Sequence, residues 1–155
     1  MRRKLIWTVG VVACAAVVLA ATGVRSTSAS PGRHPGRTLV LVQSPPRQQH
    51  VDLGDPGPSP GDLLVFASTL ADRAGNPIGD LHIACTQSFD RVAVCGGVFE
   101  LSGRGKLSVD ASPVFPDPTV GMVTGGTGEF QNARGEAHID PQPDGTTTVT
   151  FHLLG

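Results

Sequence analysis

Hydrophobic and polar side chains alternate strictly near the end of the chain. Between Ala133 and Asp140 the small or apolar positions are Ala133, Gly135, Ala137 and Ile139, and a polar residue follows each of them. A period of two is typical of a β-strand with one dry face. The pattern therefore predicts a strand over this segment, directly after the glycine-rich stretch Gly125-Gly126-Thr127-Gly128.

The last segment of the chain repeats this alternation. After Asp144-Gly145, a pair that favours a turn, the dry positions are Thr147, Val149, Phe151 and Leu153. Matching the two dry faces pairs Ile139 with Thr147, Ala137 with Val149 and Gly135 with Phe151. We expect a terminal hairpin whose loop runs from Pro141 to Gly145.

Further segments with strand character follow one another at short spacing. They are Asp62 to Asp72, Ile78 to Thr86, Val92 to Leu101, Lys106 to Val109 and Thr119 to Thr124. None of them shows a convincing helical period of 3.6. Together with the terminal hairpin they predict an all-β fold of about eight antiparallel strands, as a barrel or a sandwich.

The first 30 residues have the composition of an export signal. Arg2, Arg3 and Lys4 precede an uncharged, mostly apolar run from Leu5 to Val24, and small residues follow. The same run is about long enough to cross a bilayer as an uncleaved anchor. In both cases the remainder is expected outside the cytoplasm, either secreted or held at the membrane through this segment alone.

Residues 31–60 are rich in Pro, Gly, Arg and Gln, which predicts an extended tether before a barrel domain at 61–155. Thr38 to Gln43 is the exception and is a candidate first strand. The segment Asp62 to Asp72 is apolar on both faces, although a small barrel buries only one face of a strand in its interior. A loop, the tether or a second subunit must cover the other face, and a homo-oligomer, dimer or trimer, is the simplest arrangement.

Charge and cysteine content narrow the partners. From Pro31 onward, eight basic and thirteen acidic residues give a net charge of 8 − 13 = −5, which argues against nucleic acid. The five histidines have no metal-ligand spacing, so no metal is expected. If Ser88 to Arg91 is a turn, Cys85 and Cys95 face each other and form a disulfide; the alternative is a catalytic thiol or metal ligand near His82.

Several of these residues resemble a known family. They are Gly61-Asp62 before an apolar strand, Phe99 to Gly103, and the string GGTG-x-F-x-x-A-R-G from Gly125 to Gly135. In these the chain resembles the dirigent and allene oxide cyclase-like barrels over roughly Thr38 to Gly155. The resemblance implies an eight-stranded antiparallel barrel, often a trimer, with an apolar pocket at one mouth. It also implies that the protein steers cyclisation or coupling without a cofactor and without oxidising its substrate.

The resemblance further implies two catalytic residues. Glu129, directly after GGTG, would take a proton, and Arg134 of the A-R-G triplet would hold a developing oxyanion. The chain has no tyrosine, and its one tryptophan, Trp7, lies in the export signal. Because the phenolic pocket residues of plant members therefore have no counterpart, lignan chemistry is not expected.

Four more residues are candidate ligand-binding groups, namely His82, Glu100, Phe115 and His138. For the polar three the alternative is a solvated outer face, which alternating charged residues usually indicate. Phe115 lies in a proline-rich loop that fits a barrel mouth. The sequence thus predicts an exported barrel that binds a small apolar metabolite and acts as an isomerase or cyclase, or else a non-catalytic carrier of the same fold.

Overall fold

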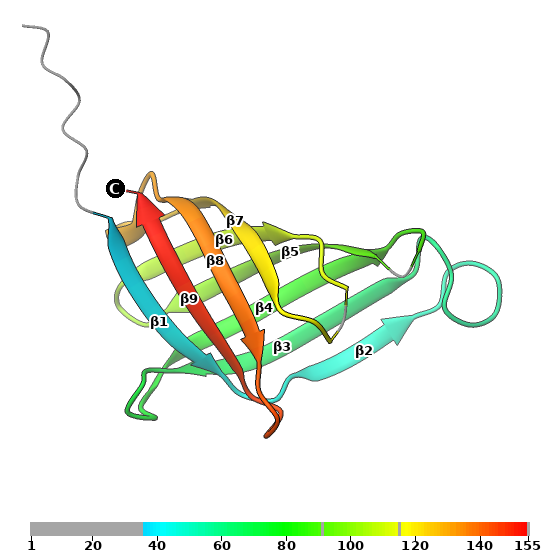
Figure 1. The fold of residues 1–155 in the computed structure, drawn as a ribbon, viewed down its shortest axis with the longest axis horizontal. Helices are drawn as coiled ribbons and strands as arrows, with labels where there is room; N and C mark the ends of the chain where they lie inside the picture. Colours follow the sequence, from blue (N-terminus) through cyan, green and yellow to red (C-terminus); the bar gives the residue numbers. More distant parts are fainter. Residues whose placement is uncertain (1–35, 91, 115, 155) are drawn as a thin grey trace, which may run out of the picture. The chain divides into compact units, whose positions relative to one another are not determined.

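The computed structural model describes residues 36–154, except Arg91 and Phe115. Within this part of the chain there are nine strands and one short 3-10 helix (Figure 1). They are β1 (Arg37–Gln43), β2 (Arg47–Val51), β3 (Leu63–Ala71), β4 (Pro77–Gln87), β5 (Ala93–Leu101), β6 (Gly105–Ala111), β7 (Thr119–Gly126), η1 (Gly128–Phe130), β8 (Arg134–Pro141) and β9 (Thr147–Leu154). No helix among these residues has the length and apolarity needed to cross a membrane.

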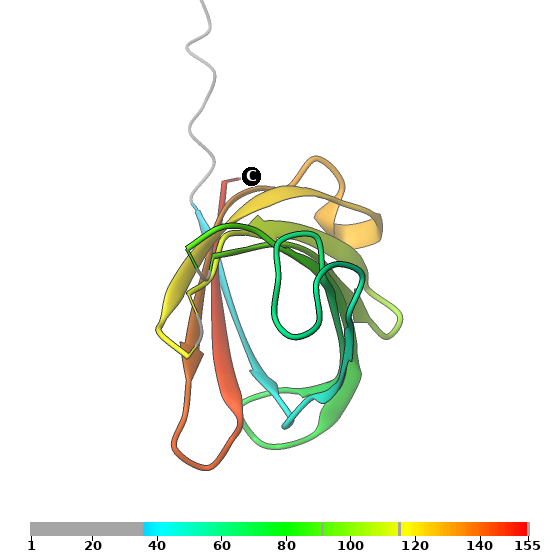
Figure 2. The ribbon, with the colours of Figure 1, turned by 90° about the vertical axis from the view of Figure 1, so that its right-hand side faces the viewer.

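The strands form one antiparallel sheet that closes on itself. Its order is β1-β9-β8-β7-β6-β5-β4-β3-β2, and a further pairing of β1 with β3 closes the ring. Eight strands, β1 and β3 to β9, therefore make the barrel, and this confirms the predicted eight-stranded antiparallel fold. Figure 2 views the barrel from the side on which the β2–β3 loop lies.

β1 closes the barrel, whereas β2 only adds a strand beside β3. The candidate strand at Thr38 to Gln43 is β1, which pairs along its whole length with β9 and meets β3 at Val42 and Gln43. β2, placed in the tether by the sequence analysis, pairs with β3 from Leu63 to Ala67. Its sequence, RQQHV, has no hydrophobic alternation because the strand is mostly exposed and is held mainly by its backbone pairing with β3.

The buried core fills one end of the barrel, which we call the closed end. Alternate residues of each strand point inward, as the strict buried–exposed alternation of β5 shows. Phe99 and Phe151 meet edge to face there, with ring centroids 5.0 Å apart. Each such side chain contributes roughly 1.5 to 3 kcal/mol when it is fully buried.

The terminal hairpin forms as predicted, but its register differs by two residues. Ile139 pairs with Val149, Ala137 with Phe151 and Gly135 with Leu153. The register is set at the loop, where the Gln142 N–H donates to the Thr146 carbonyl at 2.9 Å. A shift of two residues keeps every side chain on its own face, so alternation alone did not distinguish the two registers.

The GGTG corner folds against the start of β6 and finishes the closed end. The Thr127 N–H donates to the Lys106 carbonyl at 2.9 Å, and Phe130, 2% exposed, covers the end of the core. A Cβ on Gly126 would stand 2.7 Å from the Lys106 carbonyl oxygen, so only glycine fits. The corner is a turn with a single 3-10 turn after it, as expected for a structural element.

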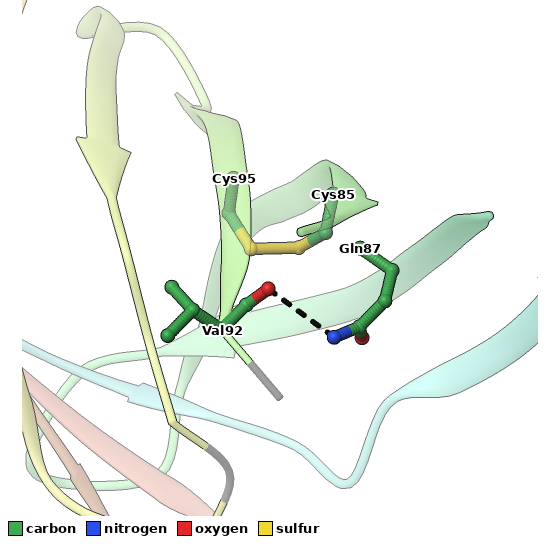
Figure 3. The surroundings of a disulfide bond; sticks show 4 residues. All are labelled: Cys85, Gln87, Val92 and Cys95. Carbon is green, nitrogen blue, oxygen red and sulfur yellow. Dashed lines mark hydrogen bonds between the residues drawn. A yellow bond between two sulfur atoms is a disulfide. The ribbon is translucent and has the colours of Figure 1, made fainter. Parts of the chain in front are cut away.

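The predicted disulfide joins neighbouring strands near the other end of the barrel. Cys85 on β4 is paired directly with Cys95 on β5, and their Cα atoms are 4.0 Å apart (Figure 3). The turn between the strands closes with a hydrogen bond from the Ser88 N–H to the Val92 carbonyl at 2.7 Å. The Gln87 side-chain amide donates to the same carbonyl at 3.2 Å.

Candidate functional site

A cavity of about 270 Å³ opens at the end of the barrel opposite the GGTG corner, which we call the open end. It lies where β1 ends, β9 begins and the loops beside β2 and β7 meet. Its apolar lining consists of Pro46, Phe66, Ile83, Cys85, Cys95, Gly97, Phe99, Val109, Ala111, Pro113, Pro116, Ile139 and Pro141. The cavity is therefore a mainly apolar space enclosed by strands from all parts of the domain.

The inner faces of β4 and β5 make one wall of this cavity. The alternation of β5 points Cys95, Gly97 and Phe99 inward, and Phe99 also belongs to the core below. Cys85 and Cys95 are 1% and 7% exposed, so the disulfide forms part of the wall rather than a surface clasp. A Cβ on Gly97 would lie 3.2 Å from the Ile83 side chain, which explains the glycine at this position.

Polar lining groups are few. They are Gln43, Gln48, Asp117, Thr119 and Thr147. Gln43 is 7% exposed and donates from Nε2 to Ser68 Oγ at 3.0 Å, while across β1 and β9 it is paired with Thr147. The amide oxygen of Gln43 and the hydroxyl of Thr147 can therefore fix the orientation of a hydrogen-bonding group on a ligand.

Among the described residues that line the cavity, Asp117 is the only one with an ionisable side chain. It lies in the β6–β7 loop, where its own N–H donates to the Val114 carbonyl at 3.0 Å and its carbonyl accepts from Thr119 Oγ1 at 3.4 Å. Its carboxylate makes no hydrogen bond or ion pair with any described residue. The carboxylate is thus available to a ligand at the rim of the cavity.

The β2–β3 loop (residues 52–62) is held in place beside the open end by a buried carboxylate. Asp62, fully buried, accepts the N–H groups of Leu53 and Ser59 at 3.0 and 2.8 Å. It also contacts His50 Nε2 at 2.9 Å. The two backbone donors, with help from His50, hold the pKa of Asp62 well below its usual range because they stabilise the ionised form.

The two predicted catalytic residues lie at the closed end. Glu129 Oε2 contacts Arg104 Nε at 3.0 Å and Arg37 Nη2 at 3.3 Å, and both guanidinium groups lie over the Phe130 ring. The hydrogen bond from Arg104 is the main reason why the pKa of Glu129 is lowered. Arg134 donates from Nη1 to the Ala133 carbonyl at 2.7 Å. Neither residue lines the cavity, and a catalytic role for them stays a prediction.

The three polar ligand-binding candidates lie on the outer face, as the alternative interpretation described. Glu100 pairs with Lys106 at 2.9 Å, and His138 Nε2 contacts Glu136 Oε2 at 3.2 Å. His82 is exposed beside a shallow groove along β2 to β5. Their binding roles likewise stay predictions, although the structure does not bring them to the cavity.

The fourth candidate, Phe115, lies outside the described residues. Its neighbours Pro113 and Pro116 do line the cavity, so the proline-rich loop is at the barrel mouth as expected. Among the described residues, no group of three or more His, Cys, Asp or Glu side chains is arranged to hold a metal.

The polar cavity residues could have been found from one signal in the sequence. Thr147 continues the dry face of Val149 and Phe151, and Gln43 continues that of Leu39 and Leu41. A polar residue at the end of an apolar strand face marks the place where the packed core ends and the cavity begins. Asp117, in a loop without periodicity, gave no such signal.

The fold and the site define a closed antiparallel barrel with an apolar cavity at one end and a packed core at the other. Solved structures share this architecture. The chain is similar to pyocyanin demethylase at 24% identity and a TM-score of 0.68, covering 76% of this chain and 99% of that one. It is similar to the exo-specific intermolecular Diels-Alderase AbnU at 13% identity and a TM-score of 0.60, covering 78% and 99%.

A dirigent protein is among the similar structures too. The pterocarpan synthase dirigent protein GePTS1 matches at 15% identity and a TM-score of 0.59, covering 77% of this chain and 83% of that one. No protein-family model and no curated protein matches the sequence. At these identities the likeness concerns the fold, and it confirms at that level the predicted dirigent and cyclase-like barrel.

Proposed function

We propose that the open-end cavity binds a small, mostly apolar metabolite and holds it in one reactive conformation, so that its cyclisation or coupling gives one product. The observation that carries this proposal is the cavity of about 270 Å³, whose lining is mainly apolar with a few hydrogen-bonding groups. It is supported by similar barrels that are named as a Diels-Alderase and a dirigent protein.

Such a site acts through confinement. A flexible substrate folded inside a fixed apolar wall meets its own reactive ends at a high effective concentration, and no cofactor is required for that effect. Gln43 and Thr147 would orient a carbonyl or hydroxyl group. Asp117 would accept a proton or stabilise positive charge that develops in the transition state.

A second candidate function is binding without turnover. One observation favours it, namely that the described lining holds the carboxylate of Asp117 but no cationic side chain opposite it. Without such a pair the cavity lacks a partner for acid–base work, and an extracellular carrier would need none. Both candidates require the same cavity.

A plug variant with a matched control tests whether the cavity is the site. Ala111 lines the cavity, whereas Ala84 is exposed on the outer face. Ala111→Trp should abolish binding of 1-naphthalenemethanol in titration calorimetry, and Ala84→Trp should leave it unchanged. Equal binding by both variants, or no binding by the wild-type protein, would overturn the proposal.

Turnover is tested with a linear triene that carries a tethered dienophile, because its intramolecular cycloaddition needs no oxidant or reductant. Chiral chromatography should show an enantiomeric excess with wild-type protein and a racemic product with Ala111→Trp. A racemic product from wild-type protein that still binds the triene would instead establish the carrier.

We also propose that the barrel works outside the cytoplasm. Support comes from the disulfide, since such bonds persist mainly in oxidising compartments. Cell fractionation followed by thiol alkylation should recover the protein outside the cytoplasm with Cys85 and Cys95 unmodified. Recovery in the cytoplasm with both thiols alkylated would contradict this.

A further inference from the structure

Charge is distributed unevenly along the barrel. At the open end the described strand ends and loops carry the carboxylates of Asp52, Asp55, Asp62, Asp90, Asp110, Asp117, Asp140 and Asp144. Among the described residues, Arg47 is the only arginine or lysine at this end. The open end therefore has a strong excess of negative charge.

The closed end has no such excess. Its basic residues are Arg37, Arg73, Arg104, Lys106 and Arg134, and its acidic residues are Asp72, Asp80, Glu100, Glu129 and Glu136, which balance among the described residues. Most of the net negative charge of the described residues therefore lies at the open end, where the cavity opens. A mouth of one sign attracts ligands of the opposite sign and repels those of the same sign.

The cavity itself favours the same sign of ligand. Asp117 supplies a carboxylate at the rim, while the described lining contains no Lys, Arg or His that would receive an anion. Phe99 lines the interior, and an aromatic ring attracts a cation to its face. An anionic ligand would lose its hydration on entry without gaining a charged partner.

We infer that the cavity selects cationic aromatic ligands, such as protonated aromatic amines or aromatic quaternary ammonium ions, over aromatic carboxylates of similar size. This inference rests on the proposed function, because it concerns the ligand of the same cavity. Asp117 is the residue that determines the specificity.

The expected size of the effect follows from Coulomb's law. A unit charge about 4 Å from a carboxylate in a water-like medium changes affinity about fivefold, upward for a cation and downward for an anion. Apart from the buried Asp62, the open-end carboxylates are exposed or half-exposed to solvent, so their contribution falls as salt shortens the screening length. The preference should therefore be larger at low ionic strength.

Three probes that share a 1-naphthylmethyl group separate charge from apolar binding. They are (1-naphthylmethyl)trimethylammonium, 1-naphthalenemethanol and 1-naphthylacetate, titrated calorimetrically into the full chain at 20 mM and 500 mM NaCl. The first should bind most tightly and the last least tightly, and high salt should reduce the difference. Asp117→Asn should weaken the cation about fivefold and leave 1-naphthalenemethanol unchanged.

Asp80→Asn is the matched control, because it removes the same charge from an exposed position on the outer face near the closed end and should change none of the three affinities. If 1-naphthalenemethanol fails to bind, the proposed function itself is overturned. If 1-naphthalenemethanol binds, three results would overturn the charge selectivity while the apolar cavity stands. They are equal affinities for the three probes, the highest affinity for 1-naphthylacetate, and an affinity for the cation that Asp117→Asn does not change.

Discussion

Removing the cross-link between Cys85 and Cys95 should destabilise the barrel by an amount that the structure allows us to calculate. The two residues are 10 positions apart in sequence and lie opposite each other on neighbouring strands. The cross-link therefore closes a short loop in the unfolded chain, while in the folded chain the strand pairing already holds the two residues together. The main effect should be on the entropy of the unfolded state.

The magnitude follows from the loop-closure relation. For a loop of about 10 residues the relation gives an entropy difference of about 9 cal/mol/K, or about 2.7 kcal/mol at 25 °C. This is a large share of the roughly 5 to 15 kcal/mol that stabilises a typical domain. The reduced protein should stay folded at 25 °C but unfold at a clearly lower denaturant concentration.

Guanidinium unfolding, followed by circular dichroism with and without a phosphine reductant, measures this difference. Because Cys85 is 1% exposed, the reductant must be added to unfolded protein before refolding. The reduced chain should also show a slightly larger m-value, since its unfolded state exposes more surface. The variant Cys85→Ala/Cys95→Ala adds a loss of packing, so it should be less stable than reduced wild-type protein.

A reduced protein with an unchanged unfolding midpoint would refute this reasoning. It would mean either that the cross-link is absent or that the unfolded chain keeps the hairpin closed without it. Mass spectrometry of the alkylated protein separates these two explanations.

Three further predictions concern acid stability, the GGTG corner and the outer face. The pKa of Asp62 is lowered in the folded protein, so the ionised carboxylate stabilises the fold fully above its unfolded pKa of about 4, and this stabilisation is lost as the pH falls below that value. Asp62→Asn should therefore flatten the dependence of stability on pH between about pH 4 and 2. Parallel curves for variant and wild-type protein would contradict this. Gly126→Ala should lower the free energy of unfolding by about 2 kcal/mol or more, because its Cβ would lie 2.5 Å from the Phe130 carbonyl oxygen. Gly125→Ala is the control and should be tolerated, because no atom lies nearer than 3.8 Å to its Cβ. Equal melting temperatures of the two variants would argue against a rigid corner. Val65 on β3 and Val98 on β5 are exposed apolar residues of one outer face. If this face is an oligomer interface, Val98→Glu should give a monomer in light scattering without lowering the melting temperature, and an unchanged mass would exclude Val98 from the interface.

Local pattern determined the strands and the direction in which their side chains point. The alternation in β8 and β9 was read correctly from the sequence, and so was the position of Cys85 opposite Cys95, because a turn between two strands fixes pairs near it. The same pattern left the register of β8 and β9 ambiguous by two residues, because the length of the loop that sets this register does not follow from alternation. The backbone pairing of β2 left no pattern in its side chains.

Only the tertiary structure decided where the cavity lies. The string after GGTG pointed to Glu129 and Arg134, but the closing of the ring through β1 and β3 puts that corner at the packed end. The cavity instead joins Gln43, Asp117 and Thr147, which come from three distant parts of the sequence. A period of two shows which face of a strand is buried. It does not show at which end of the barrel the core stops and a cavity opens, because that depends on strand tilt, closure and loop placement, which are properties of the whole sheet.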